Sequence, residues 1–374
     1  MPIEWTCPSK DAHSCYEHAR VVTDNGDKMA AAGFTTLDSR YCGEWLKALL
    51  VGGINTEPEY RRNGCVRQML EKAFSLAPER GWAVSFLHPF SFSYYRKFGY
   101  EKLSDHRIFD FPLSALEHIP RCSELKLLNS SQLLEDALCV YERFSESRNI
   151  LFRRYNSRHY SLQPHKENRY TYLWYDGSGH PAGYVTLSTE KYFKVNRMEG
   201  VCLHVHELVY TSPKSLRALL GFLRMYDGEL ERVRLENCGM SPEVDFLLRR
   251  YTHTQYTLVP DVMGRILDVK AVLSANQYPK ERGGFVLKVE DTLPFTRGTY
   301  LVEYENQAAQ ISQLPEGVRY DLRAEMPALT QLLYGYDYYT PETLPYLQGV
   351  EVAGSCEDFL RAFPKRNNGV LEHF

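Results

Sequence analysis

The stretch Tyr60-Arg61-Arg62-Asn63-Gly64-Cys65-Val66 is a basic, glycine-containing loop between two regular elements. Residues 46–54, which precede it, are largely apolar and predict a buried strand that contains Gly52-Gly53. From residue 63 to 79, apolar residues recur at steps of three and four, which predicts an amphipathic helix. Backbone N–H groups at a helix start attract anions, and the two arginines add charged donors. The loop therefore suits a nucleotide or coenzyme A pyrophosphate, although a basic turn capped by glycine is an equal alternative for the loop alone.

Strands and helices alternate on both sides of this loop. Upstream, two strands flank the hairpin turn Asp24-Asn25-Gly26, and downstream a buried strand is followed by a short helix. Such alternation predicts an α/β layer fold. The expected elements of this first segment are strands 18–22, 29–37, 46–54 and 82–87 and helices 63–79 and 92–98.

Two further segments of similar character follow. The second runs from about residue 111 to 261, with helices 131–144, 215–225 and 243–250 and strands 170–175, 182–188 and 202–210. The third starts near residue 265, with short strands 285–289, 300–304 and 309–312 and a helix 326–333. At roughly 150 residues per domain, 374 residues agree with two or three domains.

The composition excludes several classes of protein. Hydrophobic residues make up 44% and charged residues 24%, an ordinary globular mix, and the net charge of -3 argues against a nucleic-acid or membrane-surface protein. No apolar run reaches the ~18–20 residues of a membrane span. The start, Met1-Pro2-Ile3-Glu4-Trp5, does not resemble a signal peptide, and the nine cysteines contain no CxxC. We therefore expect a cytoplasmic protein with reduced thiols.

His204 and His206 alternate on one predicted strand, with Glu207 beside them. Two imidazoles at this spacing suit zinc, but the sequence shows no third ligand, and such a pair is more often one face of a half-buried strand. We therefore expect no metal.

The loop carries a resemblance to a known family. Arg61, Gly64 and Val66 occupy the positions of Arg-x-x-Gly-x-(Gly/Ala), the pyrophosphate loop of the GCN5-related N-acetyltransferases (GNAT), with Val66 in place of a small residue. The wider chain resembles the Eis-like (enhanced intracellular survival) members of that family. The stretches that carry this resemblance are 52–64, Tyr94-Tyr95-Arg96-Lys97-Phe98-Gly99-Tyr100, 203–209 and 263–268.

The resemblance implies a fold of mixed α/β sheets in three parts. A GNAT domain (1–112) and a second GNAT-like domain (113–264) precede a sterol-carrier-like (SCP2-like) domain (265–374). Only 17 residues precede His18, whereas this fold usually begins with a strand and two helices, so we expect a first domain shortened at its start. The family also implies a homo-oligomer, a hexamer.

The resemblance also implies the chemistry, an acetyl-CoA-dependent transfer of an acetyl group to a primary amine by direct attack in a ternary complex. The amine is a small molecule or a lysine-like peptide. The backbone N–H of Ile54 would hold the oxyanion, Tyr95 would act as general acid, and the Phe374 α-carboxylate would act as base. The implied coenzyme A contacts are Ile54, Thr56, Arg61, Arg62, Asn63, Gly64, Cys65 and Val66.

Each of these assignments has a structural alternative. Tyr95 is one of several aromatic residues that could simply form core, and Phe374 could end a frayed tail in which Glu372 is solvated. A binding protein for an apolar ligand, with an inactive acetyltransferase domain, is the competing function. In that case Leu332, Leu333 and Leu344 would line a groove in the third domain, whereas a core position is their more common role.

Overall fold

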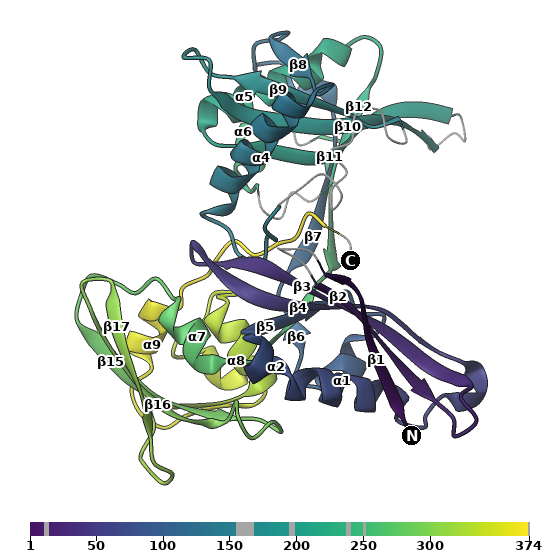
Figure 1. Cartoon of the computed structure of the whole chain (residues 1–374). Helices are drawn as coiled ribbons and strands as arrows, with labels where there is room; N and C mark the ends of the chain where they lie inside the picture. Colours follow the sequence, from purple (N-terminus) through teal and green to yellow (C-terminus); the bar gives the residue numbers. More distant parts are fainter. Residues whose placement is uncertain (11–14, 155–167, 194–198, 237–240, 250–251, 373–374) are drawn as a thin grey trace. The chain divides into compact units, whose positions relative to one another are not determined.

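The structure is a computed structural model that describes residues 1–10, 15–154, 168–193, 199–236, 241–249 and 252–372. It divides into two compact units that interleave along the chain (Figure 1). Unit 1 comprises Met1–Ser104 and Asp261–Asn368. Unit 2 comprises Asp105–Pro260 and Gly369–Glu372.

Unit 1 contains a seven-stranded sheet with the order β1-β2-β3-β4-β5-β14-β6. The first four strands form antiparallel neighbours, whereas β4 and β5 are parallel. The predicted hairpin is confirmed, since β2 pairs with β3 around a turn in which Gly26 has φ 87°. The strands are β1 Ile3–Lys10, β2 Cys15–Val22, β3 Lys28–Tyr41, β4 Glu44–Thr56, β5 Val84–Leu87, β6 Glu101–Lys102 and β14 Met263–Ile266.

Strand β1 lies before the first strand that the sequence predicted. It pairs with β2, and only residues 11–14 separate the two strands. The first sheet therefore starts with an antiparallel pair, β1 and β2. The shortened start of the first domain stays a prediction.

The helix predicted at residues 63–79 is two helices, α1 (Cys65–Ser75) and α2 (Ala77–Arg80). The break falls before Pro78, which has no N–H to continue the helical hydrogen bonds. The buried residues of α1 recur at steps of three and four, as the sequence pattern predicted, and pack in the core of the first sheet. They are Cys65, Met69, Leu70, Ala73 and Phe74.

Unit 2 contains a second seven-stranded sheet with the order β13-β7-β12-β11-β10-β9-β8. Its pairing pattern is the same as that of the first sheet. Strands β8 to β11 are antiparallel neighbours, whereas β11 and β12 are parallel. Its helices are α4 (Ser131–Ser145), α5 (Pro213–Leu223) and α6 (Glu243–Leu247). Its strands are β7 Asp105–Pro112, β8 Leu125–Leu127, β9 Tyr170–Tyr175, β10 Pro181–Phe193, β11 Glu199–Tyr210, β12 Arg232–Leu235 and β13 Gln255–Pro260.

The chain crosses from one sheet to the other at two places. Strand β7 follows β6 closely in sequence but pairs with β12 and β13 in the second sheet. Strand β14 follows β13 but lies between β5 and β6 in the first sheet. Strand β7 lies before the predicted boundary at residue 112 but belongs to the second sheet, and β14 spans the predicted boundary at residue 264 but belongs to the first. The predicted domain boundaries stay a proposal.

A third sheet, with the order β17-β16-β15-β18-β19, completes unit 1. Helix α8 (Met326–Leu333) is the helix that the sequence predicted at residues 326–333, and it lies in the interior. The Tyr41 hydroxyl donates to the Leu333 carbonyl at 2.8 Å and thereby ties α8 to β3. The other elements are β15 Gly283–Glu290, β16 Gly298–Glu305, β17 Ala308–Leu314, β18 Leu322–Glu325, β19 Val350–Val352, α7 Val269–Ser274 and α9 Glu357–Ala362. In the part of the chain that the structure describes, no helix has the length and apolar character needed to cross a membrane.

Candidate active site

Strand β4 separates from its parallel neighbour β5 part-way along its length. The pairs between them are Ala48↔Val84, Leu49↔Ser85 and Leu50↔Phe86, yet β4 continues to Thr56. Residues 51–56 therefore extend beyond the last pair with β5. A strand that diverges in this way offers backbone donors and acceptors to an extended ligand.

A β-bulge lies within this diverging part of β4. The register with β3 places Gly33 opposite Gly52 and Ala31 opposite Asn55. Gly53 and Ile54 therefore both oppose the single residue Ala32, and Gly53 has φ 60°, a conformation that favours glycine. Because a bulge re-aims the backbone locally, it gives the N–H of Ile54 a different direction from its neighbours in the ladder.

The loop between β4 and α1 has the properties of an anion site. Arg61, Arg62, Asn63 and Gly64 are all exposed, and α1 has no acidic residue in its first turn. Gly64 is the N-cap with φ 79°, and among the described residues no side chain accepts a hydrogen bond from the first turn as a cap. A Cβ placed on Gly64 would meet no described atom within 4 Å, so the space in front of the helix start is open. These residues fit a pyrophosphate group.

Cys65 and Val66 contribute to this loop in another way. Cys65 is buried at 2% exposure, and Val66 is half-buried and packs against the core. Their side chains therefore anchor the helix, and only their backbone N–H groups are suited to meet an anion.

Tyr95 lies on the short helix α3 (Phe92–Arg96), which Ser91 caps by accepting from the Tyr94 N–H. Its side chain is 3% exposed, and its ring centroid lies 5.3 Å from those of Phe90 and Tyr94. Burial, with a smaller contribution from Tyr94, raises the pKa of Tyr95 to about 12. The phenol is therefore protonated at neutral pH, as a hydrogen-bond donor or acid must be.

Profiles of known families match three parts of the chain. One acetyltransferase (GNAT) domain profile matches residues 9–103, and a second, different acetyltransferase (GNAT) domain profile matches residues 151–266. The chain belongs to the GCN5-related N-acetyltransferases. The sterol carrier protein domain matches residues 269–369, so the order of domains is that of the Eis-like members. The protein is accordingly an N-acetyltransferase, and its GNAT domains imply acetyl-CoA as the co-substrate.

Solved structures of similar fold span nearly the whole acetyltransferase. A GCN5-related N-acetyltransferase from Anabaena variabilis is 17% identical, with TM-score 0.77 over 96% of this chain and 89% of that chain. One from Kribbella flavida is 20% identical, with TM-score 0.72 over 96% and 88%. Eis1 from Mycobacterium abscessus is 17% identical, with TM-score 0.77 over 96% and 90%. Comparison with curated protein sequences gave no significant match.

His88 is a site candidate of this acetyltransferase that the sequence analysis did not single out. It follows the last residue of β5, and its Nδ1 lies 3.1 Å from the Asp261 carboxylate. The sequence feature that could have indicated it is a histidine directly after a buried strand in a layered α/β fold. Its partner is 173 residues away in the chain, so no local pattern connects the two.

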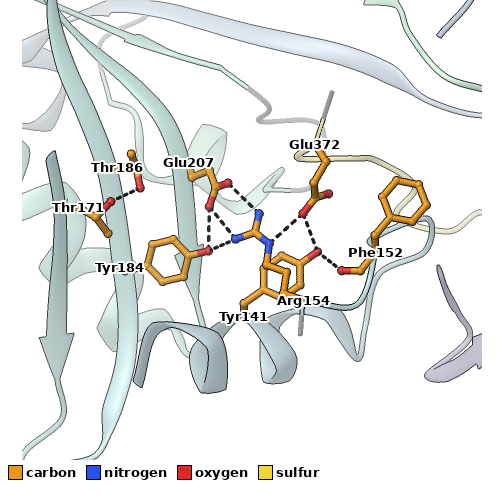
Figure 2. A network of polar contacts seen from close by, with 8 residues as sticks. All are labelled: Tyr141, Phe152, Arg154, Thr171, Tyr184, Thr186, Glu207 and Glu372. Carbon is orange, nitrogen blue, oxygen red and sulfur yellow. Dashed lines mark hydrogen bonds and ion pairs between the residues drawn. The ribbon is translucent and has the colours of Figure 1, made fainter. Parts of the chain in front are cut away.

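The C-terminal segment of the acetyltransferase is bound within unit 2 as far as Glu372. The Arg154 guanidinium lies 2.9 Å from the Glu372 carboxylate and 2.8 Å from that of Glu207 (Figure 2). Tyr141 donates to Glu372 at 3.3 Å, and Val370 is 4% exposed. The expectation of a solvated Glu372 is therefore wrong, because the apolar segment buries it against a buried guanidinium. The predicted base, Phe374, lies outside the described residues.

The third domain does not present the apolar groove of the alternative hypothesis at the predicted leucines. Leu332, Leu333 and Leu344 are at most 1% exposed and belong to the core. The groove of about 790 Å³ on this domain is lined by other residues, among them Arg282, Glu303 and Glu305. A charged lining of this kind does not favour an apolar ligand.

Proposed function

We propose that the protein transfers the acetyl group of acetyl-CoA to a primary amine by direct attack in a ternary complex. The observation that carries the proposal is the diverging strand β4, whose bulge at Gly53 and Ile54 lies ten to eleven residues before Gly64, the N-cap of an open, basic helix start. These are the two features needed to hold an extended pantetheine chain and a pyrophosphate on one side of a sheet. Acetyl-CoA supplies the activated thioester in this reaction.

The backbone of β4 and the following loop bind the co-substrate in this proposal. The N–H of Ile54 stabilises the charge that develops on the carbonyl oxygen, and the backbone of Thr56 pairs with the pantetheine arm. Arg61, Arg62 and Asn63 surround the pyrophosphate, which also accepts from the N–H groups of Gly64, Cys65 and Val66. Because these contacts are mostly to backbone, the side chains at Ile54 and Thr56 are free to pack.

Tyr95 is the proposed donor to the leaving group. Its pKa of about 12 lies above the ~8.5 of a thiol, so the phenol stays protonated and donates a hydrogen bond to the departing thiolate. A thiolate whose conjugate acid has a pKa of ~8.5 does not take the proton from a phenol of pKa about 12, so Tyr95 acts through this hydrogen bond and the released thiolate takes its proton from solvent. In the apolar setting of Phe90 and Tyr94, such a donor is worth more than it would be in water.

The Phe374 α-carboxylate is the proposed base, by resemblance to the family. Its ordinary pKa of ~3.3–3.7 leaves it ionised at pH 7, so it can attract an ammonium group and accept its proton. The binding of Glu372 by Arg154 supports an ordered approach to this terminus. Adding five residues after Phe374 should lower the acetylation rate at least ~tenfold, a threshold below the ~10²–10⁴-fold that general acid–base catalysis typically contributes. Full activity of the extended protein would remove the carboxylate from the mechanism.

Thiol release from acetyl-CoA, measured against a panel of amines, tests the function itself. We expect release that depends on both the protein and an amine, with polyamines, aminoglycosides and lysine peptides as the classes to compare. The preferred class identifies the acceptor, since the net charge of -3 favours cations of every kind. Absence of amine-dependent release with all three classes would contradict the proposal.

The same resemblance leads us to propose a cytoplasmic homohexamer. Sedimentation equilibrium of the purified protein measures its mass directly, and each chain contributes 43.4 kDa. A monomer at all accessible concentrations would exclude the hexamer.

A further inference from the structure

A cluster of histidine and glutamate side chains lies on one face of the second sheet. His204 and His206 come from β11, and Glu190 comes from the paired strand β10. Ser188 lies opposite His204 in the ladder, so Glu190, two residues further along β10, shares the face of His204. The centroids of the two imidazole rings are 4.0 Å apart.

His206 shares the face of His204 because it lies two residues further along β11, and a β-bulge falls at this residue. Thr186 pairs with Glu207 and Leu187 with Val205, so His206 is the extra residue of β11 at this point. Bulges re-aim side chains and recur beside functional sites. Glu207, the acidic neighbour in sequence, lies instead in the ion pair with Arg154 and is not part of the cluster.

The three side chains offer the donor atoms of a metal site. One carboxylate oxygen of Glu190 and one nitrogen from each of His204 and His206 all lie within 4.8 Å of one another. Two imidazoles and one carboxylate form a recurrent set for zinc and other divalent transition metals, with at least one position left for water. The sequence analysis found no third ligand, because Glu190 is fourteen residues from His204 and only the strand pairing joins them.

Neighbouring oxygen atoms hold the two imidazoles in the way that metal-binding histidines are held. His204 Nδ1 faces the Glu190 carboxylate, whereas His204 Nε2 lies 3.1 Å from the Glu236 carboxylate. His206 Nε2 lies 2.8 Å from the Ser188 hydroxyl. A ligating histidine commonly uses its second nitrogen for such a contact, which fixes the ring and its tautomer.

Burial and charge also suit a cation. His204 is 6% exposed, and each of its two nitrogens faces a carboxylate, that of Glu190 or that of Glu236. Glu190 is exposed, so the cluster is open to solvent on one side and an ion can enter. The carboxylates of Glu190 and Glu236 together balance a divalent charge.

We propose that Glu190, His204 and His206 bind a divalent transition-metal ion, with Zn²⁺ as the best match to the donors. Glu236 positions His204 from outside the coordination shell. The site ties β10 to β11 across the second sheet and is separate from the residues proposed for acetyl transfer. The competing explanation of the cluster is an ion pair without metal, in which His204 lies between the carboxylates of Glu190 and Glu236.

Metal binding to the full-length protein tests the proposal. The protein is stripped with a chelator and titrated with Zn²⁺ in competition with a chromophoric chelator, and with Co²⁺ to record its visible d–d absorption. We expect about one equivalent of either ion and a Co²⁺ spectrum of low coordination number. Glu190→Gln and His206→Asn should each weaken binding at least ~tenfold.

Two control variants separate this cluster from other donors. Cys7, Cys15 and Glu17 also lie within 4.8 Å of one another, so the double variant Cys7→Ser, Cys15→Ser must keep the affinity. His180→Asn, at an exposed histidine, must keep it as well. Because Glu190 is exposed, Glu190→Gln is the variant that should fold normally, and circular dichroism verifies this. Absence of binding, unchanged binding in Glu190→Gln, or its loss in the cysteine variant would overturn the proposal.

Discussion

At the scale of single residues, two tyrosines in one aromatic cluster make different contacts. The Tyr100 hydroxyl lies 2.7 Å from Ser85 Oγ, and the Ser85 hydroxyl donates to the Leu49 carbonyl. Tyr100 therefore helps to hold β5 against β4. The described contacts of the Tyr95 ring are with other aromatic rings. Burial raises the pKa of both phenols, but Tyr100 uses its hydroxyl in the fold and Tyr95 is the better candidate for chemistry.

Tyr95→Phe should lower kcat at least ~tenfold while it leaves the KM for acetyl-CoA nearly unchanged, because only the donor to the leaving group is lost. Steady-state thiol release measures both constants. Tyr94→Phe is the matched control and should keep kcat within about twofold. Since the pKa of Tyr95 is about 12, kcat of the wild type should show no alkaline loss from this residue below about pH 11. An unchanged kcat in Tyr95→Phe would contradict its role.

At the scale of elements, strand β4 shows how a local irregularity prepares a site. The bulge depends on Gly53, whose φ of 60° is costly for other residues. A Cβ there would lie 4.0 Å from the Gly33 nitrogen, an ordinary contact distance, so the penalty is conformational and not steric. A substitution at Gly53 thus changes the backbone of the bulge and with it the direction of the Ile54 N–H.

Gly53→Ala should cost ~1–2 kcal/mol of stability and, in addition, lower kcat at least ~tenfold. Gly81→Ala is the control, because Gly81 has φ 69° and no described atom within 4 Å of the added Cβ. It should show the same loss of stability with an unchanged kcat. Thermal denaturation and thiol release measure the two effects. Equal kcat values in the two variants would show that the bulge has no catalytic importance.

The C-terminal segment is a second element whose position depends on few contacts. Glu372→Gln removes the charge that Arg154 binds, and it should increase hydrogen exchange at residues 369–372 at least ~tenfold, since a charge-assisted bond contributes ~1.5–3 kcal/mol. Hydrogen exchange with mass spectrometry measures this. Glu351→Gln, at an exposed ion pair with Arg323, should leave the segment unchanged. Unaltered protection in Glu372→Gln would show that the apolar contacts of Val370 and Leu371 suffice.

At the scale of the whole molecule, the chain returns to its first sheet after 156 residues in unit 2, from Asp105 to Pro260. Strand β14 completes that sheet, and its Arg265 forms an ion pair with Asp291 of the third domain at 2.6 Å. Both side chains are at most 3% exposed, and Arg265 also donates to the Phe98 carbonyl. One buried guanidinium thus links the first and third domains within unit 1.

Asp291→Ala should lower the free energy of unfolding of unit 1 by ~3–5 kcal/mol, because it leaves the Arg265 charge buried without its partner. Glu71→Ala breaks a pair whose side chains are each 56% exposed, and it should cost at most ~0.5 kcal/mol. Chemical denaturation with a probe in unit 1 measures both values. A loss in Asp291→Ala no larger than that of the control would show that the pair is not important for stability.

The sequence by itself determined the family and several of the elements. Helix α8 and strand β9 match their predicted ranges, and the basic loop lies directly before α1. These features follow from local periodicity and from turn and cap residues, which act over a few positions.

The tertiary structure alone decided which distant residues meet. The exchange of β7 and β14 between sheets, the partner of Arg265, the binding of Glu372 and the third member of the histidine cluster all join residues far apart in the chain. A local pattern cannot specify such pairs, because they depend on strand order and register, and a shift of one residue reverses the face of every side chain.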